Sequence, residues 1–163
     1  MNTKKYHKKT ILQVVPALVS GGVERGTLEI AKKLVEAGFR SIVISAGGSL
    51  VAALEESGSK HIKLNVASKN PLTIWLNSKK ITKIIQEEKI DIIHARSRAP
   101  AWSCFIAAKA TGIKLITTFH GIYNFRTKIK KFYNGIMTEG NKVIAVSQFV
   151  KDHIIKNYKI DKS

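Results

Sequence analysis

Two kinds of apolar segment alternate along this sequence, and the alternation is what most restricts its fold. One kind is a short run rich in β-branched residues, and runs such as Ile90–Ile93 and Lys142–Val146 are almost continuously apolar. Strands of that composition are typical of sheets that are covered on both faces. The expected strands are Thr10–Val15, Ser41–Ser45, His61–Val66, Asp91–Ala95, Lys114–Phe119 and Lys142–Ser147.

The other kind of segment is longer, and its apolar residues recur at helical spacing. Thr27–Ala37 has such a stripe, and Gly38 stands where a C-cap is expected. A second stripe, from Ile74 to Ile85, follows Pro71, a residue typical of a first helical turn. Further helices are expected at Pro100–Thr111, Phe125–Met137 and Gln148–Tyr158, the last with Ser147 as its N-cap. Repeated strand–helix units predict an α/β domain with a doubly wound, parallel, Rossmann-like sheet flanked by helices.

Length and composition agree with one such domain. A chain of 163 residues that is 44% hydrophobic and 24% charged can bury one core. We expect a basic tail over residues 1–9, the domain over residues 10–158, and over residues 159–163 the start of a linker to a second half. Gln13 and Pro16 interrupt the early apolar run, which argues against a signal peptide. No run reaches the ~18 apolar residues of a membrane span, and we expect a cytoplasmic protein.

The net charge of +17 is the unusual feature of the composition. Such a surface attracts anions, which include nucleic acid, acidic lipid headgroups and phosphorylated substrates. Most of the charge comes from lysine, which binds phosphate less specifically than the bidentate arginine side chain. The charge therefore has two readings, a functional basic face or a general lysine bias.

Candidate ligand-binding residues follow the first expected strand. Ligands of open parallel sheets bind at the carboxyl ends of the strands. The adjacent Gly21 and Gly22 precede a helix, so their amides are suited to a phosphate or an acceptor hydroxyl; the alternative is a tight turn without a ligand. The dinucleotide motif Gly-x-Gly-x-x-Gly and the phosphate-binding P-loop are both absent. We therefore expect no nucleotide cofactor.

Two later strands also end in residues that suit a binding site. Arg96 and Arg98 follow the fourth strand and are suited to a phosphate or a carboxylate, unless they belong to a solvated loop. His94, among apolar neighbours, is expected to be an interior histidine. His120 and Gly121 end the fifth strand, where an imidazole can bond a sugar hydroxyl or change protonation near neutral pH.

Other kinds of site are not indicated. The five histidines lack ligand spacing, and the single cysteine, Cys104, lies in an apolar stretch typical of a core. We expect no metal. Glu24 is the one acid in a candidate ligand loop, so no pair of catalytic carboxylates is formed.

The segment Phe125–Met137 has an apolar face, with lysines that fall mostly away from it. A helix of this kind suits an anionic membrane surface. The alternative is a core helix with a solvated lysine face.

Three motifs, each at a strand end, resemble the N-terminal domain of family 4 glycosyltransferases, which are retaining enzymes of the two-domain GT-B fold. They are Val15–Arg25, Thr117–Gly121 and Val143–Ser147, and the likeness spans about Thr10 to Tyr158. The stretch His94–Trp102 is similar to that of bacterial members that build envelope polysaccharide or lipopolysaccharide.

The resemblance implies roles for individual residues. Gly21 and Gly22 would lie against the donor diphosphate or the acceptor, with Glu24 and Arg25 on the acceptor side. His120 would bond a hydroxyl of the transferred sugar, and Ser147 would mark a strand end that faces the interdomain cleft.

The resemblance also implies the substrates of the enzyme and a second domain beyond the one described above. The family transfers a sugar from a nucleotide-sugar donor with retention and without a metal, and its donor site lies mainly in a second domain. We therefore expect an acceptor-side domain, inactive alone, for an envelope polysaccharide or lipid-linked acceptor. The alternative is a basic module that binds nucleic acid or a membrane without catalysis. Nucleic acid ranks second because the lysines are spread over several segments and only 7% of residues are aromatic.

Overall fold

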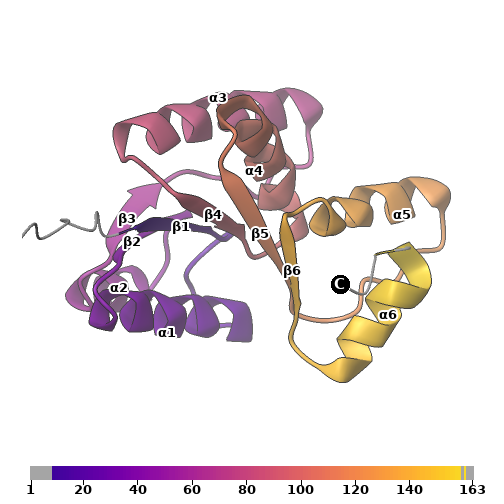
Figure 1. The fold of residues 1–163 in the computed structure, drawn as a ribbon, viewed down its shortest axis with the longest axis horizontal. Coiled ribbons are helices and arrows are strands. Elements are labelled where there is room, and N and C mark those ends of the chain that lie inside the picture. Colours follow the sequence, from indigo (N-terminus) through magenta and orange to yellow (C-terminus); the bar gives the residue numbers. More distant parts are fainter. Residues whose placement is uncertain (1–8, 159, 161–163) are drawn as a thin grey trace, which may run out of the picture.

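A six-stranded, all-parallel sheet forms the centre of the molecule in a computed structural model that describes residues 9–158 and 160 (Figure 1). The strand order is β3-β2-β1-β4-β5-β6. The winding direction reverses between β1 and β4, which confirms the predicted doubly wound, Rossmann-like α/β fold. The strands are β1 (Thr10–Val14), β2 (Arg40–Ser45), β3 (Lys60–Lys63), β4 (Ile92–Ala95), β5 (Lys114–Phe119) and β6 (Lys142–Ala145).

Helices cover both faces of the sheet, as the apolar strands require. In Figure 1, α1 and α2 lie below the sheet, whereas α3 and α4 lie above it. The helices are α1 (Gly22–Glu36), α2 (Val51–Glu56), α3 (Pro71–Glu87), α4 (Arg98–Thr111), α5 (Lys128–Gly135) and α6 (Gln148–Tyr158), and the 3₁₀ helix η1 (Ile136–Thr138) follows α5.

The core is divided by the sheet because successive strand side chains point to opposite faces. Leu12 and Val14 pack with Cys104 of α4 on one face, whereas Val43 packs with Ala31 of α1 on the other. Cys104 is fully buried, and its burial raises the pKa of the thiol. The prediction that this cysteine fills the core is thus confirmed.

Some element boundaries differ from the sequence-based expectation. Helix α1 begins at Gly22 rather than Thr27, because Gly21 is extended and Glu24 places a negative charge in the first turn, where the helix dipole favours it. Helix α2 was not predicted, and β3 ends at Lys63 rather than Val66. The expected helix 125–137 begins only at Lys128.

Predicted helix ends are confirmed at three positions. Gly38 and Gly112 follow their helices with positive φ angles of 83° and 75°, a conformation that glycine adopts without strain. Ser147 caps α6, because its Oγ accepts a hydrogen bond from the Val150 amide at 3.3 Å.

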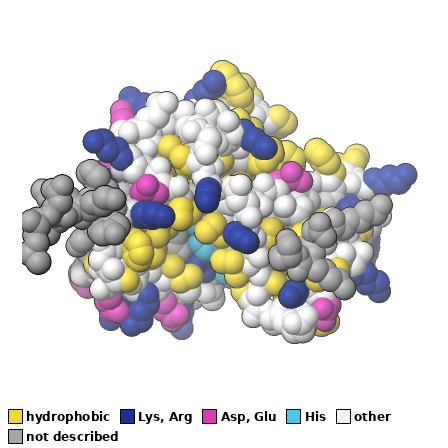
Figure 2. All heavy atoms as spheres, viewed as in Figure 1, with side chains coloured by type: hydrophobic (Ala, Val, Ile, Leu, Met, Phe, Trp, Pro, Cys, Tyr) yellow, Lys and Arg dark blue, Asp and Glu magenta, His cyan; other side chains and the backbone are white. Residues whose placement is uncertain are grey.

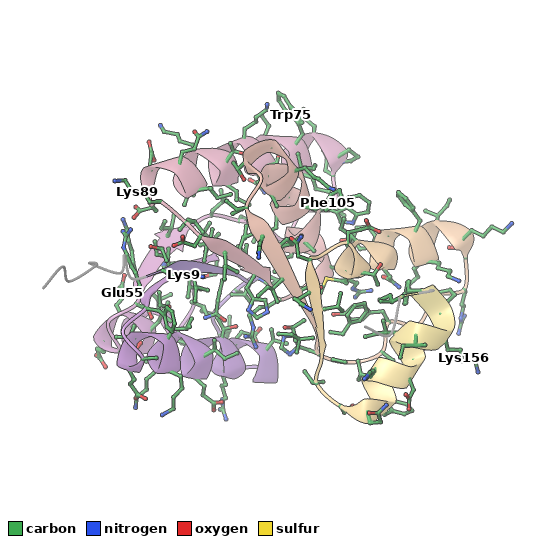
Figure 3. The ribbon with its side chains drawn as sticks, in the orientation of Figure 1. Lys9, Glu55, Trp75, Lys89, Phe105 and Lys156 are labelled. Atoms are coloured by element: carbon green, nitrogen blue, oxygen red, sulfur yellow. The ribbon has the colours of Figure 1, made fainter. Side chains whose placement is uncertain are left out.

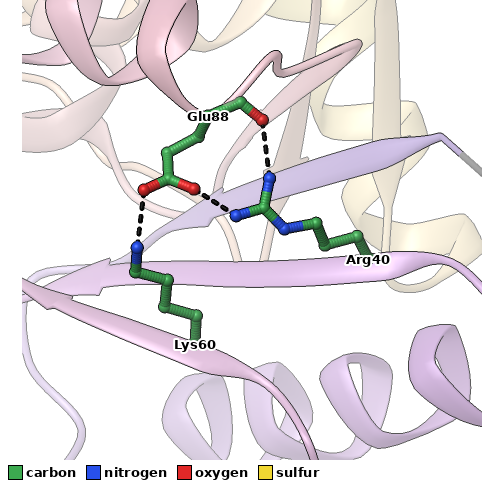
Figure 4. Close-up of polar contacts among 3 residues, drawn as sticks. All are labelled: Arg40, Lys60 and Glu88. Carbon is green, nitrogen blue, oxygen red and sulfur yellow. Dashed lines mark hydrogen bonds and ion pairs between the residues drawn. The ribbon is translucent and has the colours of Figure 1, made fainter.

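An ion-pair cluster ties together the amino ends of β2 and β3 (Figure 4). Glu88, just after α3, accepts hydrogen bonds from Arg40 and, at 2.6 Å, from Lys60. The Lys60 bond and then the Arg40 bond hold the pKa of the Glu88 carboxyl below its usual value, although partial burial opposes them. The cluster joins α3 to the sheet at the edge opposite the carboxyl ends of the strands.

The predicted tail and linker fall almost entirely outside the described residues. Residues 1–8, 159 and 161–163 are not described, so the expected functions of those segments are not tested. None of the described helices combines the length and the apolar character needed to cross a membrane.

Candidate active site

A pocket of about 320 Å³ opens at the carboxyl edge of the sheet, where β1, β4 and β5 end. It lies beside the point at which the winding direction reverses, the usual ligand position in this kind of sheet. Residues that directly follow each of these three strands line the pocket. The lining residues are Val15, Pro16, Val23, Glu24, Arg96, Ser97, Arg98, His120, Gly121 and Tyr123.

Arg96 reaches from the end of β4 across β1 toward α1. It is only 3% exposed, and its backbone amide bonds the Val14 carbonyl at 3.0 Å. A methyl group at Gly26 would lie 3.2 Å from its Nη2 atom, so the glycine makes room for the guanidinium. Burial lowers the pKa of Arg96 to about 10, which leaves the side chain charged at neutral pH. Among the described residues, no carboxylate forms an ion pair with it, and its buried Nε lacks a partner.

Gln13 holds Arg96 in place, and sequence reasoning did not identify it as a site residue. Its Oε1 accepts a hydrogen bond from Arg96 Nη1 at 3.1 Å, and its Nε2 donates to the Thr27 carbonyl at 3.2 Å. The side chain is fully buried in the middle of β1. A polar residue inside an otherwise apolar strand is the signal that points to such a role, because buried polar groups need partners.

His120 faces the same pocket in a neutral form. Burial lowers its pKa to about 4, and the positive charge of Arg96 adds to that effect, whereas Glu24 opposes it. The imidazole therefore has one donor and one acceptor nitrogen at neutral pH. Its Nε2 is buried without a hydrogen-bond partner in the described structure, so it remains able to bond a ligand hydroxyl.

His94 is an interior histidine, as expected. Its Nε2 lies 2.7 Å from the Thr118 hydroxyl, and the residue is 7% exposed. Burial lowers its pKa to about 3, and the charge of Arg96 contributes further. His94 thus supports the site from beneath without lining it.

Glu24 lies over the start of α1 and is the one carboxylate among the pocket-lining residues. Its Oε2 is so close to Gly21 that a Cβ atom there would collide with it. At Gly22 a Cβ would meet nothing within 4 Å, so this position faces open space. The two glycines therefore border the pocket without lining it.

Arg98 has partners inside the protein, which differs from the solvated-loop alternative. Its Nη1 donates to Asn134 Oδ1 at 2.8 Å, and its guanidinium carbon lies 4.2 Å from the centre of the Tyr123 ring. The buried Asn134 in turn donates to the Tyr123 carbonyl at 3.4 Å. Arg98 thus fixes the segment after β5 against α5 while it lines the pocket.

The structure brings most of the predicted site residues together. Glu24, Arg96, Arg98, His120 and Gly121 line one pocket, with Arg96 and Arg98 making it basic. Arg25 is exposed and Ser147 caps α6, and neither lines the pocket. A role for any of these residues in binding stays a prediction. No group of His, Cys, Asp and Glu side chains suited to a metal occurs within the described part of the chain.

The fold and the pocket define the class of this protein as a Rossmann-like α/β domain with a basic pocket at the point where the winding direction reverses. The sequence profile of Glycosyltransferase Family 4 matches residues 20–163. The chain therefore belongs to glycosyltransferase family 4, and its fold is that of the N-terminal half of a GT-B glycosyltransferase.

Solved structures with the same fold support this assignment. A glycosyltransferase from Rickettsia africae ESF-5 is 57% identical, with a TM-score of 0.83 over 96% of this chain and 41% of that one. The HepE protein of Anabaena, solved with UDP and glucose, is 20% identical, with a TM-score of 0.73 over 93% of this chain and 41% of that one. MurG of Acinetobacter baumannii is 15% identical, with a TM-score of 0.65 over 84% of this chain and 41% of that one. The two more distant likenesses show the fold alone.

Two further results bound the comparison. A search of curated proteins found no match. The chain spans 41% of the length of each of the three solved proteins named above.

Proposed function

We propose that this chain is the acceptor-side domain of a retaining glycosyltransferase that moves a sugar from a nucleotide-sugar donor to an envelope polysaccharide or lipid-linked acceptor. The donor would be held mainly by a second Rossmann-like domain, and the chain alone would not catalyse transfer. Family membership supports the transfer reaction, and the coverage of 41% of the Rickettsia africae chain supports the need for a second domain.

The observation that carries the proposal is the pairing of His120 and Arg96 in one pocket. His120 is neutral and has a partnerless Nε2, which suits a hydrogen bond to a sugar hydroxyl. Arg96 is a buried cation without a carboxylate partner among the described residues, which suits a phosphate oxygen. A phosphate-bearing sugar satisfies both groups at once.

The chemistry follows from these two side chains. Departure of a nucleoside diphosphate leaves negative charge on its phosphate oxygens, and fixed positive charge in a partly buried site stabilises that charge. Arg96 is held for this purpose by Gln13 before any ligand arrives. The first turn of α1, whose Val23 and Glu24 line the pocket, adds the positive end of a helix dipole.

The acceptor class is inferred from the sequence around the start of α4. The likeness of His94–Trp102 to envelope-building members favours an envelope polysaccharide or a lipid-linked acceptor. The HepE neighbour was solved with UDP and glucose, which is consistent with a nucleotide-sugar donor for a protein of this fold. The predicted contacts of Gly21, Glu24 and Arg25 with the acceptor belong to this proposal.

Ligand titration of the chain by ¹H–¹⁵N NMR tests the assignment of the pocket. UDP-glucose and inorganic pyrophosphate should shift the amide signals of Glu24, His120 and Gly121, and R96M should abolish those shifts. The matched control is R126M, which removes an exposed arginine outside the pocket and should leave the shifts unchanged. Saturable shifts that avoid the pocket, or shifts that R126M abolishes and R96M does not, would contradict the proposal.

A further inference from the structure

We infer that Asn134 of α5 is a positioning residue for the pocket, because it holds Arg98 and the segment after His120 in place without neutralising the arginine. The inference deepens the proposed function, on which it rests for an anionic ligand. Asn134 does not line the pocket itself. It acts through two residues that do, Arg98 and Tyr123.

Both ends of the Asn134 amide have a partner, and the side chain is fully buried. Its Oδ1 accepts a hydrogen bond from Arg98 Nη1 at 2.8 Å, and its Nδ2 donates to the Tyr123 carbonyl at 3.4 Å. A guanidinium can only donate and a carbonyl can only accept, so this position needs an acceptor on one side and a donor on the other. The asparagine amide offers both on one planar group.

Arg98 is a cation without an anionic partner. It is the first residue of α4, where the positive end of the helix dipole disfavours a cation. None of the ion pairs among the described residues includes it. Its compensation comes from the neutral Asn134 amide and from the Tyr123 ring. In Figure 2, histidine side chains (cyan) lie among basic ones (dark blue) near the centre of the view, and the visible acidic side chains (magenta) lie farther out.

A neutral acceptor at position 134 keeps the charge of Arg98 free for a ligand. A carboxylate of the same shape would bond Arg98 more strongly, but it would neutralise the cation and repel the Tyr123 carbonyl. An apolar side chain would leave the guanidinium and the carbonyl unpaired. Asn134 therefore combines a fixed geometry with an unspent charge, which a stronger ion pair would not do.

The segment after β5 depends on side chains for its position. It carries His120, Gly121 and Tyr123 into the pocket. Residues 120–126 form no backbone–backbone hydrogen bond with another described residue. The bond from Asn134 is one side-chain contact that holds them, and the packing of Tyr123 on Phe119, with ring centres 5.1 Å apart, is another.

The helix that carries Asn134 is itself fixed to the body of the domain. Trp102 Nε1 of α4 donates to the carbonyl of Tyr133, the preceding residue, at 3.3 Å. The hydroxyl of Thr117 on β5 donates to the Met137 carbonyl of η1 at 2.5 Å. Figure 3 shows side chains packed between β6, α5 and α6. Asn134 therefore links a firmly held helix to a segment that lacks backbone hydrogen bonds of its own.

An NMR relaxation measurement without ligand tests the positioning role. N134L removes both hydrogen bonds, and it should lower the ¹⁵N order parameters of residues 120–126 from about 0.85 toward 0.6. N77L is the matched control, because the buried Asn77 holds a different loop through its bond to the Asn65 carbonyl at 2.9 Å. Unchanged order parameters for residues 120–126 in N134L would overturn the inference, since the aromatic packing alone would then hold the segment.

Calorimetric titration with inorganic pyrophosphate tests whether the charge is kept for a ligand. N134D should bind about tenfold or more weakly than the parent chain, and more weakly than N134L, because the new carboxylate neutralises Arg98. A merely structural role predicts the opposite order, since N134D retains an acceptor for Arg98. N157D is the control for net charge: Asn157 lies on α6 and donates to the His153 carbonyl at 2.8 Å.

The two measurements separate this inference from the proposed function. An N134D chain that binds pyrophosphate as tightly as N157D, or more tightly than N134L, would overturn the inference. If the parent chain does not bind pyrophosphate at all, the proposed function fails. The order parameters of residues 120–126 then still decide whether Asn134 positions the segment.

Discussion

Arg96 and Gln13 show how single residues prepare this site. A guanidinium that is 3% exposed is costly to bury, and its one side-chain hydrogen bond goes to a neutral amide. The arrangement leaves positive charge directed at a pocket that also holds His120. We interpret this as electrostatic preparation for an anionic ligand, achieved at some expense of stability.

A double-mutant cycle tests the link between these two residues. Q13L should lower the free energy of unfolding by about 1–3 kcal/mol, because Arg96 Nη1 then lacks a partner in a buried position. R96M/Q13L should recover part of that loss, since neither side of the bond is then left unpaired. Urea denaturation of the four proteins measures the coupling energy, and strictly additive changes would show that the bond does not hold Arg96 in place.

The buried histidine predicts a specific dependence of stability on pH. His94 has a pKa of about 3 when folded, against 6.5 ordinarily, so below pH 6.5 the unfolded chain binds a proton that the folded chain does not. The contribution of the neutral His94 to the free energy of unfolding is complete above pH 6.5 and falls as the pH drops toward 3. Between pH 7 and pH 5 we expect a loss of about 2 kcal/mol that H94Q lacks. Identical pH slopes for both proteins in urea denaturation would refute the assignment of a neutral, buried imidazole.

At the scale of elements, backbone hydrogen bonds clamp the loop after β1 to the loop after β2. The loop after β1 bonds the loop after β2 through Leu18 N to Gly47 O at 2.8 Å and Leu50 N to Leu18 O at 2.9 Å. Gly48 has a φ of 144°, and a Cβ there would collide with the Leu18 backbone. The clamp thus depends on a glycine that allows both an unusual conformation and a close approach.

Alanine substitutions at Gly48 and Gly22 compare the effect on stability of the loop contact with that of the start of α1. G48A should destabilise the chain by about 3 kcal/mol, because the backbone conformation and the contact with Leu18 are both unfavourable for alanine. G22A is the matched control, since its Cβ would meet nothing within 4 Å, and it should be neutral or stabilising by up to about 1 kcal/mol. Thermal denaturation compares the two, and a stable G48A protein would show that the loops move apart without cost.

The periodicity of the sequence predicted the parallel sheet and the sheet edge at which the pocket lies, because strand and helix patterns persist over many residues. It could not reveal α2, which spans only Val51–Glu56 and is too short for a clear helical stripe. Gln13 was seen only as an interruption of an apolar run, because its partner Arg96 is far away in the sequence. Arg98 likewise could not be distinguished from a solvated arginine until the fold placed Asn134 beside it.

At the scale of the whole molecule, the pocket and the main ion-pair cluster lie at opposite edges of the sheet. The pocket lies at the carboxyl ends of β1, β4 and β5. The Arg40–Lys60–Glu88 cluster stabilises the opposite edge. This arrangement agrees with the proposed acceptor-side role, in which the carboxyl edge of the sheet would face a donor-binding domain.

Nucleotide release by a chimera tests the central claim most directly. The chimera fuses this chain to the part of the Rickettsia africae glycosyltransferase outside the 41% that the chain covers, and a panel of nucleotide sugars serves as donor. We predict release by the chimera, none by the chain alone, and a loss of about 100-fold or more in an H120A chimera. Equal release by the chain alone, or an H120A chimera as active as its parent, would contradict the claim that this pocket is the acceptor-side half of a glycosyltransferase active site.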